Sequence, residues 1–137
     1  MPKKPQNRRS APDQDKLIVD ALRDVGKPLS AYEIIDHLKE KGLSAPPTVY
    51  RALNRLIEDG LAHRLESLNA FVACRHPHHK GTAAFAICDG CGTVREFHEA
   101  ESVRRLDAAA VEAGFTGKEM TIELRGRCKD CEVRVAR

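Results

Sequence analysis

Two pairs of cysteines with the spacing Cys-x-x-Cys are the clearest chemical signal in this 137-residue sequence. The pairs are Cys88 with Cys91 and Cys128 with Cys131, and each falls in a stretch typical of a tight turn. Four thiolates can complete a tetrahedral zinc shell with bonds of about 2.3 Å, and a closed shell leaves no position for a reacting water. The spacing therefore predicts a structural zinc site. Thioredoxin-like redox chemistry is the competing interpretation, and the absence of a βαβ pattern disfavours it.

The first half of the chain has the periodicity of three helices and a hairpin. Apolar residues recur at helical spacing over residues 15–25, 31–42 and 46–60. A capping box precedes the second of these stretches, and two prolines begin the third. The alternating stretches 61–66 and 70–74 then predict two strands of a β-hairpin. Three tightly connected helices followed by a hairpin indicate a winged helix-turn-helix.

The third predicted helix has one apolar side and one polar side. In a winged helix, this helix enters the major groove of DNA and the hairpin lies beside the backbone. Arginine can bind guanine through two hydrogen bonds, asparagine can pair with adenine, and a tyrosine ring can contact a thymine methyl. We expect base contacts from Tyr50, Arg51 and Asn54 and phosphate contacts from Arg55 and Arg64. A solvated helix surface is the alternative for any one of these residues, but their joint position favours DNA.

The fifth cysteine, Cys74, suggests a second metal site with mixed ligands. In either plausible register of the hairpin it lies opposite His63 or one place away, where Cβ atoms are about 4.5–5.5 Å apart. His79 from a histidine-rich loop and Glu96 from a later strand would complete the site, with His78 as the rival of His79. Metal binding would then fix one half of the chain against the other. The alternative is that Cys74 is a small buried residue and His63 a wing residue near a phosphate.

The second half of the chain is predicted to be a small α+β unit. Strands at 83–88 and 93–97 flank the first cysteine pair, and they are followed by a helix over 99–113 and a strand at 120–124. The zinc site would tie the closing cysteine pair back to the two strands across the intervening helix.

Length and composition limit the classes of protein. A chain of this length holds one ordinary domain or two small ones, which disfavours a large enzyme. The sequence has 42% apolar and 31% charged residues and no run of about 18 apolar residues, which is typical of a soluble protein. The basic stretch 1–10 is not a secretory signal. We therefore expect a cytoplasmic protein whose reduced thiols bind metal.

The formal net charge is only +3, so bulk charge does not indicate a nucleic-acid-binding protein. A basic arm precedes the first helix and consists of Lys3, Lys4, Arg8 and Arg9. Such an arm can add phosphate contacts or can simply increase solubility.

The stretch Pro47–Leu53, the hairpin, the histidine-rich loop, residues 87–92 and the closing Cys-x-x-Cys together resemble the ferric uptake regulator superfamily, and within it the zinc uptake regulators. The resemblance covers about residues 13–131. It implies a cytoplasmic homodimer that, when loaded with zinc, binds an AT-rich palindromic operator and represses genes for zinc acquisition. It also implies that Tyr50 and Arg51 contact bases.

The same resemblance implies two zinc ions per subunit. One is structural and held by the four paired cysteines; the other is regulatory, in a site that includes His63, Cys74 and Glu96. The expected fold class is α+β, an N-terminal winged helix-turn-helix followed by a small α/β dimerisation domain. The expected divisions are a basic flexible arm (1–12), a DNA-binding domain (13–74), a histidine-rich linker loop (75–82) and a dimerisation and structural-zinc domain (83–137).

The leading hypothesis is a zinc-responsive transcriptional repressor, because thiolate with imidazole favours zinc over iron(II) or manganese(II). An iron, manganese or peroxide sensor of the same superfamily and a non-sensing, zinc-stabilised DNA-binding module are the alternatives. An enzyme such as a base deaminase is disfavoured, because it needs His-x-Glu before the cysteine pair and an open coordination site. We thus expect operator DNA and a second copy as partners, and no catalytic residue, membrane or small-molecule substrate.

Overall fold

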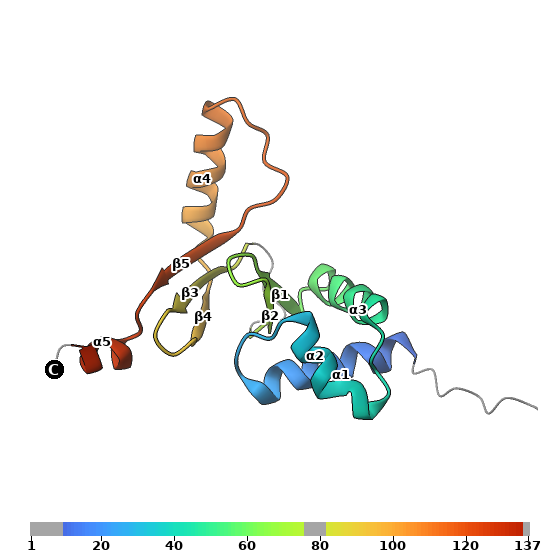
Figure 1. Cartoon of the computed structure of the whole chain (residues 1–137). Coiled ribbons are helices and arrows are strands. Elements are labelled where there is room, and N and C mark those ends of the chain that lie inside the picture. The colour runs from blue at the N-terminus through green and yellow to red at the C-terminus, as the bar shows by residue number, and fades with distance from the viewer. Residues whose placement is uncertain (1–9, 76–81, 136–137) are drawn as a thin grey trace, which may run out of the picture. The chain divides into compact units, whose positions relative to one another are not determined.

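The computed structural model describes residues 10–75 and 82–135, with side chains through Val133 (Figure 1). The chain divides into two compact units, residues 1–78 and 79–137. The division falls inside the stretch 75–82 that was expected to be a linker. Each unit is described by itself.

Unit 1 begins with three helices. They are α1 (Ala11–Val25), α2 (Ala31–Leu38), continued by one 3-10 turn η1 (Lys39–Lys41), and α3 (Pro46–Glu58). Ser10 caps α1 by accepting a hydrogen bond from the Asp13 backbone N–H. The start of α1 at Ala11 and its cap at Ser10 fall within the stretch 1–12 that was expected to be a basic arm.

The capping box at the start of α2 is confirmed. The Glu33 backbone N–H donates to Ser30 Oγ at 3.2 Å, and the Ser30 N–H donates to Glu33 Oε1 at 3.0 Å. Each side chain thereby satisfies a backbone donor that has no partner within the helix. The backbone hydrogen bond from Ser30 is the main cause that lowers the pKa of the Glu33 carboxyl.

The hairpin packs onto the three helices through a continuous apolar core. Strands β1 (Ala62–Leu65) and β2 (Ala70–Ala73) pair antiparallel, and Leu29 forms a bridge with Phe71. The largest fully buried side chains of the unit are Ile18, Ile34, Leu38, Val49, Leu53, Leu56 and Leu65. The predicted winged helix is therefore confirmed in its elements: the apolar stripe of each helix faces one core.

The described part of unit 2 contains a three-stranded sheet and two helices. In chain order these are β3 (Ala84–Cys88), β4 (Val94–Phe97), α4 (Ala100–Glu112), β5 (Ile122–Gly126) and α5 (Lys129–Val135). The strand order is β4-β3-β5; β3 is antiparallel to β4 and parallel to β5 (Figure 1). The last strand lies two residues later than its alternation predicted, and α5 was not predicted.

Among residues 10–75 and 82–135, none of the helices combines the length and the apolar character that crossing a bilayer requires.

Candidate metal centres and nucleic-acid interface

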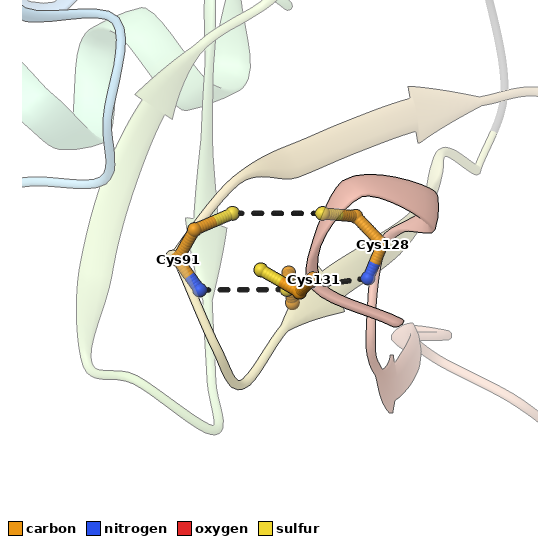
Figure 2. A group of neighbouring side chains, drawn as sticks. Cys91, Cys128 and Cys131 are labelled. Atoms are coloured by element: carbon orange, nitrogen blue, oxygen red, sulfur yellow. Dashed lines mark hydrogen bonds between the residues drawn. The ribbon is translucent and has the colours of Figure 1, made fainter. Parts of the chain in front are cut away.

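The two cysteine pairs converge in unit 2. Cys88 ends β3, Cys91 lies in the following turn, Cys128 precedes α5 and Cys131 lies within it. Their four sulfur atoms all lie within 4.8 Å of one another, and Cys91 Sγ is 3.7 Å from Cys128 Sγ (Figure 2). Bonds of about 2.3 Å in a tetrahedral shell require sulfur atoms about 3.8 Å apart. The arrangement therefore fits a zinc ion.

The backbone around this cluster is joined independently of any ion. The parallel register of β3 and β5 places Cys88 beside Gly126, and the Asp89 N–H donates to the Gly126 carbonyl at 2.7 Å. Arg125 and Asp89 form an ion pair at 3.1 Å. The Gly92 N–H closes the turn onto the Cys88 carbonyl, with a positive φ of 76° that favours glycine. Strand pairing thus brings the two cysteine pairs together.

Gly90 lies close against the sulfur cluster. A Cβ at this position would lie 2.9 Å from Cys131 Sγ, so only glycine leaves room for the sulfur. Three backbone N–H groups point at Cys88 Sγ: those of Gly90 at 3.3 Å, Cys91 at 3.5 Å and Cys128 at 3.2 Å. These donors, Cys128 first and Cys91 next, lower the pKa of the Cys88 thiol to about 6.

The pKa values of the Cys91 and Cys131 thiols are shifted in opposite directions. Thr93 Oγ1 lies 2.9 Å from Cys91 Sγ and is the main cause that lowers the pKa of that thiol. The neighbouring sulfurs of Cys128, Cys88 and Cys91, in that order, raise the pKa of Cys131 to about 12. Four crowded thiols cannot all ionise without a cation between them. A divalent metal supplies that charge, so the donor set fits zinc chemically as well as geometrically.

His63 and Cys74 lie together on one face of the hairpin of unit 1. A nitrogen of the His63 ring and Cys74 Sγ lie within 4.8 Å of each other. Cys74 is buried and His63 half-buried. The pair can therefore offer one imidazole and one thiolate to the same ion.

Neither of the two registers expected for this hairpin, with Cys74 opposite His63 or one place away, is the observed one. The turn takes up Glu66 as well as the three residues that follow it, so that Ala62 pairs with Ala73 and His63 with Val72. The Cys74 N–H donates to the Leu61 carbonyl, which places Cys74 two positions from His63. An offset of two keeps both side chains on one face of the ribbon, so the two donors still meet.

Of the other expected ligands, only Glu96 lies among the described residues. Glu96 lies on β4 of unit 2, where its Oε2 is 2.9 Å from His98 Nε2. His78 and His79 lie outside the described residues. Within the described part of unit 1, only His63 and Cys74 of the expected regulatory ligands can be compared, and the structure brings them together.

One side of α3 carries the residues expected to read bases. Tyr50, Arg51 and Asn54 are exposed, whereas Val49 and Leu53 on the opposite side are buried. Arg51 Nε also donates to the Pro47 carbonyl one turn earlier, at 3.3 Å. The guanidinium is thus held near the first turn of α3.

The two arginines expected to contact phosphates have intramolecular partners. Arg55 forms an ion pair with Asp15 of α1 at 2.9 Å, and this partner raises the pKa of the guanidinium. In this structure Arg55 thus ties α3 to α1 through a partly exposed ion pair, and its expected phosphate contact stays a prediction. Arg64 is exposed on β1, where it donates to Asn69 Oδ1 at 3.0 Å.

The sequence model of the Ferric uptake regulator family matches residues 8–125. This chain belongs to that family. The zinc uptake regulation protein of Escherichia coli strain K12 is 43% identical over 108 residues, which are 75% of this chain and 61% of that relative. The match therefore spans less than two thirds of the relative's length.

Solved structures of this family have the same fold. The crystal structure of holo XcZur is 40% identical, with a TM-score of 0.81, and the match covers 88% of this chain and 84% of that one. A zinc uptake regulator complexed with zinc and DNA is 32% identical, with a TM-score of 0.86 and coverage of 96% and 89%. The expected α+β fold, a winged helix followed by an α/β domain, is confirmed.

Sequence reasoning missed several residues that shape these sites. Thr93 contacts Cys91, and its signal was a hydroxyl two residues after the second cysteine. Gly90 was expected to ease the turn, but its close approach to Cys131 was not expected. Asp15 and His98 gave no such signal, because their partners are set by helix packing and by strand alternation.

Proposed function

We propose that this chain is a zinc-responsive transcriptional repressor, whose zinc-loaded homodimer binds palindromic, AT-rich operator DNA in the cytoplasm and represses genes for zinc uptake. The observation that carries the proposal is the imidazole of His63 beside the sulfur of Cys74 on the hairpin of a winged helix. Thiolate with imidazole favours zinc, whereas iron(II) and manganese(II) favour imidazole with carboxylate. The resemblance to zinc uptake regulators supports the same metal.

In this proposal the four paired cysteines hold a structural zinc ion. Their geometry supports a closed shell of four thiolates, which stabilises the fold and leaves no position for catalysis. We accordingly propose a regulator that is not an enzyme. The ion would add its stabilisation to the β3–β5 pairing and fix α5 against the turn after β3.

A second, regulatory zinc would be bound by His63, Cys74, His79 and Glu96, with His78 as the alternative to His79. The first two ligands belong to unit 1 and Glu96 to unit 2. An ion bound by both units would favour one relative orientation of the winged helices, and that orientation would be the one that fits the operator. Zinc would thus act by differential affinity for the DNA-binding arrangement.

The exposed side of α3 is proposed to read the operator. Arg51 and Asn54 offer the donor and acceptor patterns that suit guanine and adenine, and Tyr50 can contact a thymine methyl or a phosphate. Arg64 on the hairpin is proposed to contact a phosphate. A zinc ion with four thiolates carries a net charge of −2, so DNA affinity would depend on this local surface and would fall steeply with salt.

A second copy of the chain is the proposed partner of unit 2. None of the thirteen residues of α4, all within the described part of the chain, is buried. Apolar side chains are exposed on α4, on the segment after it and on β5: Leu106, Val111, Phe115 and Leu124. The strand β5 also lies at the edge of its sheet. Exposed apolar groups beside an edge strand are typical of an interface between subunits.

The test is a zinc titration of protein whose structural site is already filled, with operator affinity measured at each step. We expect tight operator binding only after a second equivalent of zinc has bound, and loss of this response in Cys74→Ser and His63→Ala. Both variants should keep the structural zinc, which serves as the control for folding. Equal operator binding with and without the second equivalent would favour a zinc-stabilised DNA-binding module that does not sense metal.

A further inference from the structure

We propose that His98 is a positioning residue for the regulatory metal: it donates a hydrogen bond from Nε2 to one oxygen of Glu96 and leaves the other oxygen for zinc. This inference rests on the proposed function, in which Glu96 is a ligand. It assigns a role to a residue that the cysteine and histidine spacing did not indicate.

The geometry of β4 produces this contact. Along the strand, Glu96 is less exposed than its neighbours Arg95 and Phe97, and His98 continues the same alternation just after the strand ends. Side chains two positions apart lie on one face of a strand, so Glu96 and His98 are neighbours without any distortion of the backbone. Their Oε2 and Nε2 atoms are 2.9 Å apart, a normal hydrogen-bond length.

Both side chains are shielded from water. The side chain of Glu96 is 3% exposed and that of His98 is 9% exposed. Across the strand pair, the residue opposite Glu96 is Phe85, which is buried. A hydrogen bond to a carboxylate is stronger in such surroundings than in water, and an unsatisfied buried carboxylate oxygen is costly.

One fixed oxygen has a direct consequence for metal binding. A carboxylate has two oxygens, and a donor on one of them selects the rotamer of the side chain and the direction of the second oxygen. Without the donor, glutamate must lose this rotational freedom when the ion binds. Partners of this kind typically change metal affinity by about 10–100-fold.

His98 also connects the carboxylate to the segment that enters α4. It lies between the end of β4 at Phe97 and the first residue of α4, Ala100. Through His98, the segment before α4 fixes the position of the Glu96 carboxylate. This segment belongs to the unit that we propose forms the dimer. The alternative role, direct ligation by His98, would require Nε2 to leave Glu96 or the ring to bind through its other nitrogen.

The experiment uses the full chain with its structural site filled and measures zinc affinity at the regulatory site by competition with a chelator of known affinity. The variants are His98→Leu, which removes the donor, and His98→Gln, whose amide N–H can take the place of Nε2–H. Arg95→Gln, an exposed change on the other face of the same strand, is the matched control. We expect His98→Leu to bind zinc about 10–100-fold more weakly, with two zinc ions per chain at saturation, and His98→Gln to regain most of the affinity.

Cobalt(II) in the regulatory site separates positioning from ligation. We expect the d–d bands of His98→Leu to keep the wavelength and intensity of the wild type, because the number and kind of ligands are unchanged. Wild-type zinc affinity in His98→Leu, or altered d–d bands that His98→Gln does not restore, would overturn the positioning role. If His98→Leu loses its structural zinc, His98→Asn replaces it, because its shorter amide does not reach Glu96.

These outcomes are distinct from failure of the proposed function. That failure would appear in the wild type and in Arg95→Gln, as binding of a single zinc ion per chain or as Glu96→Ala with unchanged affinity for the second ion. The role of His98 alone would be rejected by a different set of results. The wild type would bind two zinc ions, Glu96→Ala would bind the second ion more weakly, and His98→Leu would bind it with full affinity.

Discussion

Replacement of Gly90 by alanine should weaken the structural zinc site. The added Cβ would lie 2.9 Å from Cys131 Sγ and 3.2 Å from Cys131 Cβ, and the first distance is one that real Cβ atoms essentially never show. Cys131 must therefore move by several tenths of an ångström. Zinc–sulfur bonds tolerate only about ±0.2 Å, so a movement of this size strains the four-thiolate shell.

The expected magnitude follows from the cost of overpacking. Insertion of one methyl group into a well-packed site typically costs about 1–3 kcal/mol. At about 1.4 kcal/mol per tenfold change, this corresponds to zinc binding that is about 5–150-fold weaker. The effect should appear in the zinc dissociation constant because the strain is greatest when all four sulfurs surround the ion.

The assay is competition for the structural zinc with a chromogenic chelator, followed at equilibrium. Gly126→Ala is the matched control: Gly126 pairs with Cys88 at the same end of the sheet, and nothing lies within 4 Å of a Cβ at that position. Its affinity should stay within about twofold of the wild type. If Gly90→Ala also binds zinc like the wild type, the close approach of Cys131 to the turn does not limit this site.

Further changes test unit 1. Arg51→Ala should cost about 1–3 kcal/mol of operator affinity, mainly at one base pair, whereas Arg64→Ala should weaken operator and random DNA alike; binding assays on both DNAs at several salt concentrations distinguish them. Asp15→Asn removes the ion pair between α1 and α3, which is partly exposed, so thermal unfolding should detect a loss of no more than about 1 kcal/mol and DNA affinity should change little. Ser30→Ala should cost about 1 kcal/mol in urea unfolding at neutral pH. Because folding lowers the pKa of Glu33, the share of stability linked to that carboxyl is present above its ordinary pKa of 4.5 and is lost as the pH falls through the lowered value. Ser30→Ala keeps the backbone N–H that is the main cause of the lowered pKa, so the wild type and the variant should both lose this share in acid.

The sequence predicted the order of the elements well because each carries a local signal. The capping box of α2, the prolines of α3 and the alternation of β1 and β2 all act within a few residues. The four-cysteine cluster was also predictable. Each Cys-x-x-Cys pair is a local pattern, and the site needs only that the two turns come together. Such local rules do not depend on how helices or strands pack against one another.

Packing determined the points that were missed. The register of the hairpin depends on whether Glu66 belongs to the turn or to β1, and the periodicity is compatible with either. Arg55 falls on the polar side of α3, but the crossing of α1 places Asp15 within its reach. The contact between His98 and Glu96 required knowledge that alternation continues past the end of β4.

The parallel pairing of β3 with β5 gives unit 2 a high cost in chain entropy on folding. Cys91 and Cys128 are 37 positions apart, and closing a loop of that length costs about 3 kcal/mol of chain entropy before any favourable contact is made. An ion that joins the two turns offsets this cost, so a shortage of the structural zinc would make the folded form of unit 2 less stable. In the proposed regulator, the structural zinc would act when the chain folds and the regulatory zinc each time the zinc supply of the cell rises.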